Sequence, residues 1–145
     1  MNLTGNWKGI YTYGKGYPQS VVGTSEQFEL SIVDKDGSIS GSCIDNVVKA
    51  VEGNESYIVG TFKDNIINFK KRYKYHTAFD ERGNTIFNPE PKSEGVDYTV
   101  SVRKKIFSKG FYFLGKWTIT VTFKDYSGQL QTYNCMGSWE MEQSK

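Results

Sequence analysis

Apolar and polar residues alternate with a period of two along almost the whole chain. In the clearest run, 111–123, the odd positions, Phe111 and Trp117 among them, are apolar or Gly, and the even positions from Lys116 to Lys124 are Thr or Lys. Successive side chains of a strand point to opposite faces, so this pattern predicts a strand with one buried face. No segment of comparable length has a helical period. The chain is therefore predicted to be all-β.

Eight such runs follow one another in the sequence. They cover 7–13, 28–32, 39–43, 58–62, 67–73, 96–102, 111–123 and 133–141. Segment 46–51 is the best exception and is expected to form a single helical turn. A length of 145 residues fits one domain. We predict that residues 1–145 form a single domain, an eight-stranded up-and-down antiparallel β-barrel.

The connections between these runs differ in length at the two ends of such a barrel. If the first strand rises, the lower end carries short links and the upper end carries three long ones and one short one. The lower links are 34–37, 63–65 and 104–110, and the upper links are 14–25, 45–55, 75–95 and the short 125–128. Long loops in compact domains tend to be lids or binding loops. The upper end is therefore the predicted working end.

Every tryptophan stands two residues after a glycine, in the motifs that end at Trp7, Trp117 and Trp139. Residues i and i+2 share a face, so each motif places an empty position beside a large ring, which suits the tapering interior of a small barrel. In the meander, Trp7 and Trp139 are expected near the lower end and Trp117 nearer mid-height, in one sector of the barrel. We expect the three rings to plug the floor.

The motif Gly5-Asn6-Trp7 at the start of the first strand, the eight-strand meander and the long loops at one mouth together resemble the calycin barrels. This group includes lipocalins, avidins and fatty-acid-binding proteins. Gly95-Val96-Asp97-Tyr98 is similar to the Thr-Asp-Tyr motif of lipocalins, but no lipocalin-style Arg follows the last strand. The resemblance implies a small, largely apolar ligand inside the barrel. Some members act instead as protease inhibitors.

The inward positions of the upper half form an apolar wall with several hydroxyl groups and one ammonium group. They are Tyr11, Tyr13, Phe28, Lys71, Tyr73, Tyr98, Val121 and Tyr133. Ligand pockets are built in this way, with a few polar groups that fix orientation. Alternatively these side chains fill the lumen, because an eight-stranded barrel can be just wide enough for its own side chains.

Lys71 interrupts an otherwise apolar inward face. One interpretation is a counter-charge for a carboxylate or phosphate on a ligand, because an unpaired buried ammonium is costly. The other is that Lys71 extends to the open mouth or pairs with an inward Asp or Glu.

Other classes of site find little support in the composition. A net charge of +2 is too small to predict a nucleic-acid partner. The only histidine, His76, and the two cysteines, Cys43 and Cys135, have no metal-ligand spacing. We therefore expect free thiols, no metal and no cofactor. No catalytic constellation can be assembled, so we do not expect an enzyme.

Two further expectations concern location and function. The chain has no stretch of 18 apolar residues and no secretory leader before its first strand, so we expect a cytoplasmic protein without a membrane partner. The predicted function is binding of a small apolar or amphipathic molecule, in one interpretation an anionic one, in the upper lumen. The alternative is a protein-interaction or inhibitor module that uses the long upper loops on a filled barrel.

Overall fold

A computed structural model describes residues 1–50, 52–74, 77–79, 82–83, 85–87, 97–124 and 127–144. Within these ranges the backbone alone is described at 50, 77–79, 85–87, 121–124, 130–131 and 133. The elements are β1 (Gly5–Tyr13), β2 (Ser25–Lys35), β3 (Ser38–Asp45), α1 (Asn46–Ala50), β4 (Ser56–Lys63), β5 (Ile66–Tyr73), β6 (Thr77–Phe79), β7 (Thr85–Phe87), β8 (Tyr98–Phe107), β9 (Gly110–Lys124) and β10 (Leu130–Gln143).

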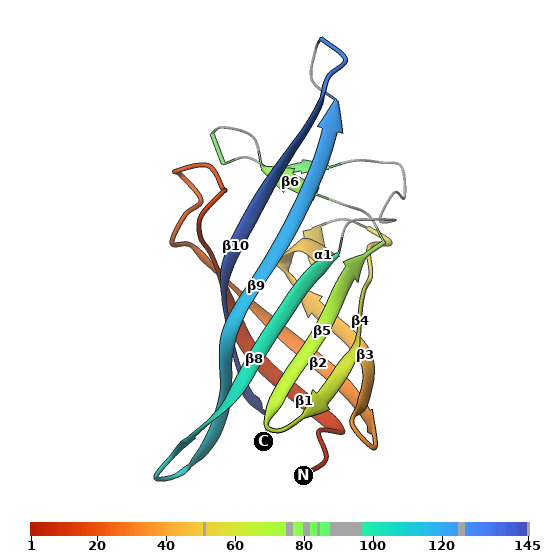
Figure 1. Cartoon of the computed structure of the whole chain (residues 1–145), viewed down its shortest axis with the longest axis vertical. Helices are drawn as coiled ribbons and strands as arrows, with labels where there is room; N and C mark the ends of the chain where they lie inside the picture. The colour runs from red at the N-terminus through yellow and green to blue at the C-terminus, as the bar shows by residue number, and fades with distance from the viewer. Residues whose placement is uncertain are drawn as a thin grey trace.

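Eight of these strands close into an antiparallel barrel in the order β1-β10-β9-β8-β5-β4-β3-β2 (Figure 1). This confirms the predicted fold and the barrel type that the calycin resemblance implies. β6 and β7 form a separate hairpin inside the segment predicted as a long loop. The short helix α1 confirms the expected helical turn. None of the helices in the described ranges is long and apolar enough to span a membrane.

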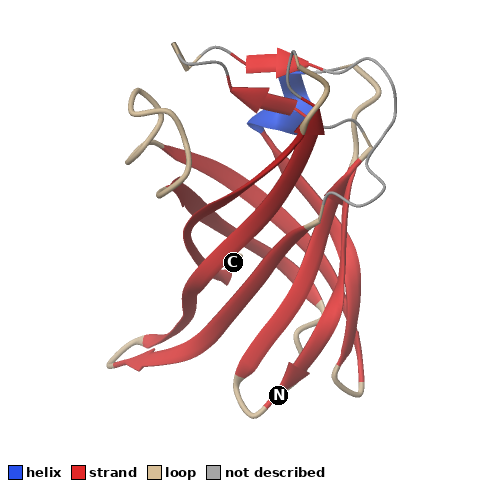
Figure 2. Cartoon of the chain, turned by 45° about the horizontal axis from the view of Figure 1, so that its top comes forward, coloured by secondary structure: helices blue, strands red, loops and turns tan. Residues whose placement is uncertain are grey.

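The two ends of the barrel are built differently. At the lower end, Asp36 and Gly37 join β2 to β3, and Asp64 and Asn65 join β4 to β5; all four residues have positive φ, as in type I′ turns. The upper end carries α1 and the β6–β7 hairpin (Figure 2). The third lower link, 104–110, was expected to be a loop, but β8 and β9 pair as far as Phe107 and Gly110. That expectation was wrong: the exposed lysines of this segment give it a polar composition typical of loops, although its backbone is paired as a hairpin.

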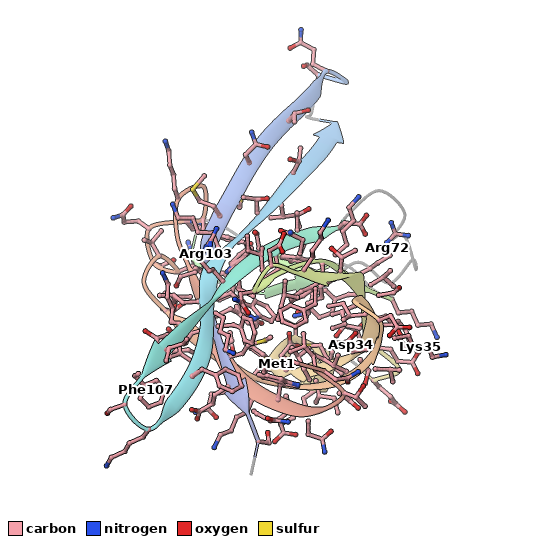
Figure 3. The ribbon with its side chains drawn as sticks, turned by 60° about the horizontal axis from the view of Figure 1, so that its bottom comes forward. Met1, Asp34, Lys35, Arg72, Arg103 and Phe107 are labelled. Carbon is pink, nitrogen blue, oxygen red and sulfur yellow. The ribbon has the colours of Figure 1, made fainter. Side chains whose placement is uncertain are left out.

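The lower half of the barrel has an apolar core closed by the N-terminal segment. Trp7 is fully buried and its indole Nε1–H donates to the Leu3 carbonyl oxygen at 2.8 Å. The Asp34 carboxylate accepts the backbone N–H of Leu3 at 2.9 Å and that of Gly37 at 2.8 Å. Figure 3, which looks at this end, places Met1 within the ring of strands. The barrel therefore has a closed floor here.

Only one of the three tryptophans belongs to this floor. Trp7 pairs with Gln143 in the β1–β10 ladder, so Trp139 lies four residues, roughly 13 Å, further up β10. Trp117 packs among Tyr13, Tyr17 and Tyr98 in the upper half. The predicted low position of Trp139 and the expectation that all three rings plug the floor were wrong because barrel strands are tilted and staggered, so position along a strand does not give height. The prediction of one sector was right, since β1, β10 and β9 are neighbours.

We expect Gly137→Ala to lower the free energy of unfolding. A Cβ at this position would lie 2.5 Å from the Trp117 ring and 2.0 Å from the backbone oxygen of Thr12. Overpacking of this kind costs about 1–3 kcal/mol. Urea unfolding at neutral pH measures the change, with Ser138→Ala on the exposed face next to it as the control. An unaltered unfolding curve for Gly137→Ala would contradict this packing.

Candidate functional site

Three hydrogen-bond donors converge on one carboxylate oxygen inside the barrel. Lys71 Nζ, on β5, lies 2.7 Å from Asp45 Oδ2, at the end of β3. The hydroxyl groups of Tyr73 and Tyr11 donate to the same oxygen, the latter over 3.2 Å. Lys71 Nζ also donates to the Tyr73 hydroxyl oxygen at 2.5 Å. Lys71 is 2% exposed and Asp45 is 1% exposed, so this is a buried polar cluster rather than a surface ion pair.

Asp45 uses its second carboxylate oxygen to hold α1. Its Oδ1 accepts the backbone N–H of Val48 at 2.9 Å, the usual role of a residue that caps a helix. Burial by itself raises the pKa of Asp45, but the Lys71 charge and the hydrogen bonds outweigh it, and the pKa lies below its ordinary value. Asp45 is therefore ionised at neutral pH and connects the lumen to the upper end.

Aromatic rings surround the Lys71 ammonium group on several sides. Its nitrogen lies 4.5 Å from the ring centroid of Tyr73, 5.0 Å from that of Tyr11, 5.6 Å from that of Trp139 and 5.9 Å from that of Tyr98. Such contacts stabilise a cation that has lost its water. The cluster is thus a neutral ion pair within an aromatic lining.

Burial sets the protonation of the other titratable groups in the lining. It is the main reason why the pKa of Tyr11, of Tyr13 and of Tyr73 lies above the ordinary value, and the Asp45 charge adds to the effect. These hydroxyl groups therefore stay protonated. Burial also raises the pKa of Cys43 to about 11, although the Lys71 charge lowers it. The described residues contain no group of His, Cys, Asp or Glu side chains suited to a metal ion.

The structure brings most of the predicted site residues together. Tyr11, Tyr13, Phe28, Lys71 and Tyr73 are buried, and Tyr98 is half-buried against the core. Val121 and Tyr133 pair in the β9–β10 ladder, but their side chains lie outside the described residues. The pairing of Lys71 with an inward acid is confirmed by Asp45.

Asp45 and Trp139 are site residues that the sequence analysis missed. Asp45 was assigned to a connection, yet it continues the inward face of Ile39 and Cys43 by the same period of two. That parity was the available signal, together with the interpretation that Lys71 pairs with an inward acid. Trp139 had been assigned to the floor. His76, the only histidine in the sequence, lies outside the described residues.

The indole N–H of Trp139 distinguishes it from the other two tryptophans. Trp7 donates to the Leu3 carbonyl oxygen, and Trp117 donates to that of Ser138 at 3.0 Å. Trp139 is 2% exposed, and its Nε1 has no hydrogen-bond partner within the described part of the protein. Its ring is stacked on Phe28 at a centroid distance of 4.1 Å. A buried donor without a partner therefore lies beside the polar cluster, and such groups are rare in folded proteins.

Comparison with protein-family models and with curated proteins gives no match. Among solved structures, the chain is similar to rhizavidin, with a TM-score of 0.47 and 10% sequence identity over 95% of this chain and 84% of that chain. The fold given above rests on its own strand pairing.

We expect Lys71→Met to destabilise the protein strongly at neutral pH, because it leaves the Asp45 carboxylate charged and buried. Removing one partner of a buried ion pair costs about 3–5 kcal/mol. The double variant Lys71→Met/Asp45→Leu should recover much of this loss, and urea unfolding of both variants measures the coupling. Equal stability of Lys71→Met and the parent protein would show that the pair is not buried as described.

The ion pair also predicts a pH dependence. The pKa of Asp45 is depressed in the folded state, so its contribution to stability is complete above its unfolded pKa of about 3.9 and is lost as the pH falls through the folded pKa. The difference in unfolding free energy between the parent protein and Asp45→Asn should therefore be constant near neutrality and shrink in acid. Denaturant titrations over the acid range test this, and a difference that grows in acid would contradict it.

Proposed function

We propose that the protein binds a small molecule in the upper interior of the barrel. The observation that carries this proposal is the buried Trp139 N–H, which has no partner among the described residues, next to the Asp45–Lys71–Tyr73 cluster. An unsatisfied buried donor costs about 1–3 kcal/mol, and an acceptor atom on a ligand would remove that cost. The half-buried Tyr17 and Tyr98 form the rim past which a ligand would enter.

The contrast between the two halves of the barrel supports the same proposal. Above the floor, where Asp34 holds the N-terminal segment, inward positions of the lower half are apolar, with Ile32, Ile67 and Phe113 as examples, whereas an ion pair and tyrosines occupy the upper half. Replacing a buried ion pair by apolar residues is often neutral or stabilising. Stability alone therefore does not account for the polar half, whereas recognition of a ligand does.

The charges of the cluster limit the chemistry of the ligand. The Asp45 carboxylate already neutralises the Lys71 ammonium group at 2.7 Å. An anionic group on a ligand would have to compete with this carboxylate for Lys71. We therefore propose an amphipathic ligand with an apolar body and an uncharged polar end. That end would accept a hydrogen bond from Trp139 Nε1 and pack against tyrosine rings.

We propose binding without catalysis, in the cytoplasm. The raised pKa of Tyr11 and of Tyr73 keeps their hydroxyl groups protonated, as donors rather than bases. Cys43 and Cys135 are buried free thiols, in keeping with a reducing compartment.

Native mass spectrometry of protein purified from its own host tests the proposal. We expect the parent protein to retain a small molecule. Once that molecule is released and titrated back, Trp139→Phe should bind it about fivefold more weakly, the equivalent of about 1 kcal/mol for one hydrogen bond. Tryptophan fluorescence measures the affinity.

Trp117→Phe is the matched control, because it makes the same change in the upper half but removes an N–H that is already paired with Ser138. It should lower stability more than Trp139→Phe, with a smaller effect on affinity. Absence of any retained molecule would oppose the proposal and favour a protein-interaction role for the upper connections. Equal loss of affinity in both variants would remove Trp139 from the site.

A further inference from the structure

The hairpin formed by β8 and β9 projects beyond the lower end of the barrel. The β5–β8 ladder ends at Ile66 and Arg103, and the β9–β10 ladder ends at Phe113 and Met141. Residues 105–112 therefore pair only with each other. The backbone N–H of Lys104 still donates to the Asn65 carbonyl oxygen, so the three β8 residues beyond it, 105–107, correspond to roughly 10 Å of free hairpin. Figure 3 shows this projection, with Arg103 near its base and Phe107 near its tip.

The hairpin is cationic along its length. Arg103, Lys104, Lys105 and Lys109 lie on it, and the sequence from 98 to 124 contains no Asp or Glu. Among the described residues, none of these four side chains forms a salt bridge. Lys104 Nζ lies 4.6 Å from the centroid of the Phe111 ring instead. The positive charge of the hairpin is thus available to an external anion.

The tip of the same hairpin is apolar and open to solvent. Ile106 is 81% exposed, the most of any large apolar residue in the described chain, and Phe107 is 47% exposed. The Phe107 ring contacts the Tyr112 ring of the same hairpin, with centroids 5.9 Å apart. Exposed aliphatic and aromatic side chains between cations are the pattern of a segment that inserts into a lipid interface, where insertion is about 5–10 Å deep. A polyanion such as nucleic acid would bind the lysine and arginine side chains but would provide no apolar environment for Ile106.

We propose that this hairpin, residues 103–112, docks the protein onto an anionic lipid bilayer. Lysine and arginine side chains at its flanks would contact the headgroups, and Ile106 and Phe107 would enter the interface. In the other two lower turns an exposed lysine stands next to the exposed aspartate, Lys35 beside Asp36 and Lys63 beside Asp64, whereas the hairpin has lysines and no acid, so its positive charge makes it the preferred contact. The sequence-based expectation of no membrane partner considered spanning segments and not a hairpin of this kind. The upper mouth of the barrel would face away from the bilayer.

Flotation with vesicles tests the proposal on the full chain. The parent protein should bind vesicles of phosphatidylserine and phosphatidylcholine in equal parts, should bind pure phosphatidylcholine vesicles far less, and should be released by added salt. Lys105→Gln/Lys109→Gln should weaken binding by on the order of tenfold, since each cation near the surface contributes to the attraction. Ile106→Ser/Phe107→Ser should weaken it to a similar extent. Circular dichroism confirms that each variant is folded.

The control is Lys15→Gln/Lys49→Gln, which removes the same charge from exposed positions at the upper end and should bind like the parent protein. A dye on Ser108→Cys should become shielded from water on mixed vesicles, whereas the same dye on Gln19→Cys at the upper end should not; Cys43 and Cys135 are buried and stay unlabelled. Absence of binding, or equal loss in the control, would overturn the proposal. If binding requires the lysines but not Ile106 and Phe107, the bilayer proposal is wrong and a soluble polyanion is the better candidate for the partner.

Discussion

The carboxylate of Asp45 is the point on which the upper half of this barrel depends. One oxygen receives Lys71, Tyr73 and Tyr11, and the other caps α1 through Val48. These contacts join three barrel strands, β1, β3 and β5, to the helix at the upper end. Because these partners are buried or held by the backbone, loss of this one side chain would leave the Lys71 ammonium group buried without a counter-charge. Buried polar networks of this kind are stabilising only when all members are satisfied.

The barrel is divided into a half that provides stability and a half that can recognise a ligand. The lower half has an apolar core, tight turns and a floor held by Trp7 and Asp34. With that half closed, the upper half can tolerate an ion pair, several tyrosine hydroxyl groups and an indole N–H that has no partner in the described part of the chain. The two proposals use opposite ends of the molecule, so a protein held at a bilayer by its lower hairpin would keep its upper mouth open to the surrounding solution.

The three tryptophans show how far a sequence motif can be interpreted. Each follows a glycine by two residues, and in each case the ring lies in the barrel interior, as the alternation requires. Their chemistry differs because their partners come from other parts of the chain: Leu3 for Trp7, Ser138 for Trp117, and none among the described residues for Trp139. An identical local motif thus gives two structural rings and one candidate recognition group.

The alternation of side chains by itself determined the all-β class, the eight barrel strands and which of the described residues point inward, because a period of two is a local property of an extended backbone. The lengths of the connections predicted the two unlike ends. The alternation also placed Lys71 inside and gave an inward acid as one of its possible partners. Only the tertiary structure identified Asp45 as that acid, since the β3–β4–β5 ladders bring together residues 26 apart in the chain. The heights of Trp117 and Trp139, and the projection of the 103–112 hairpin, likewise follow from how far each strand slides past its neighbour. Strand stagger in a closed barrel is set by the whole ring of pairings, and no single stretch of sequence contains it.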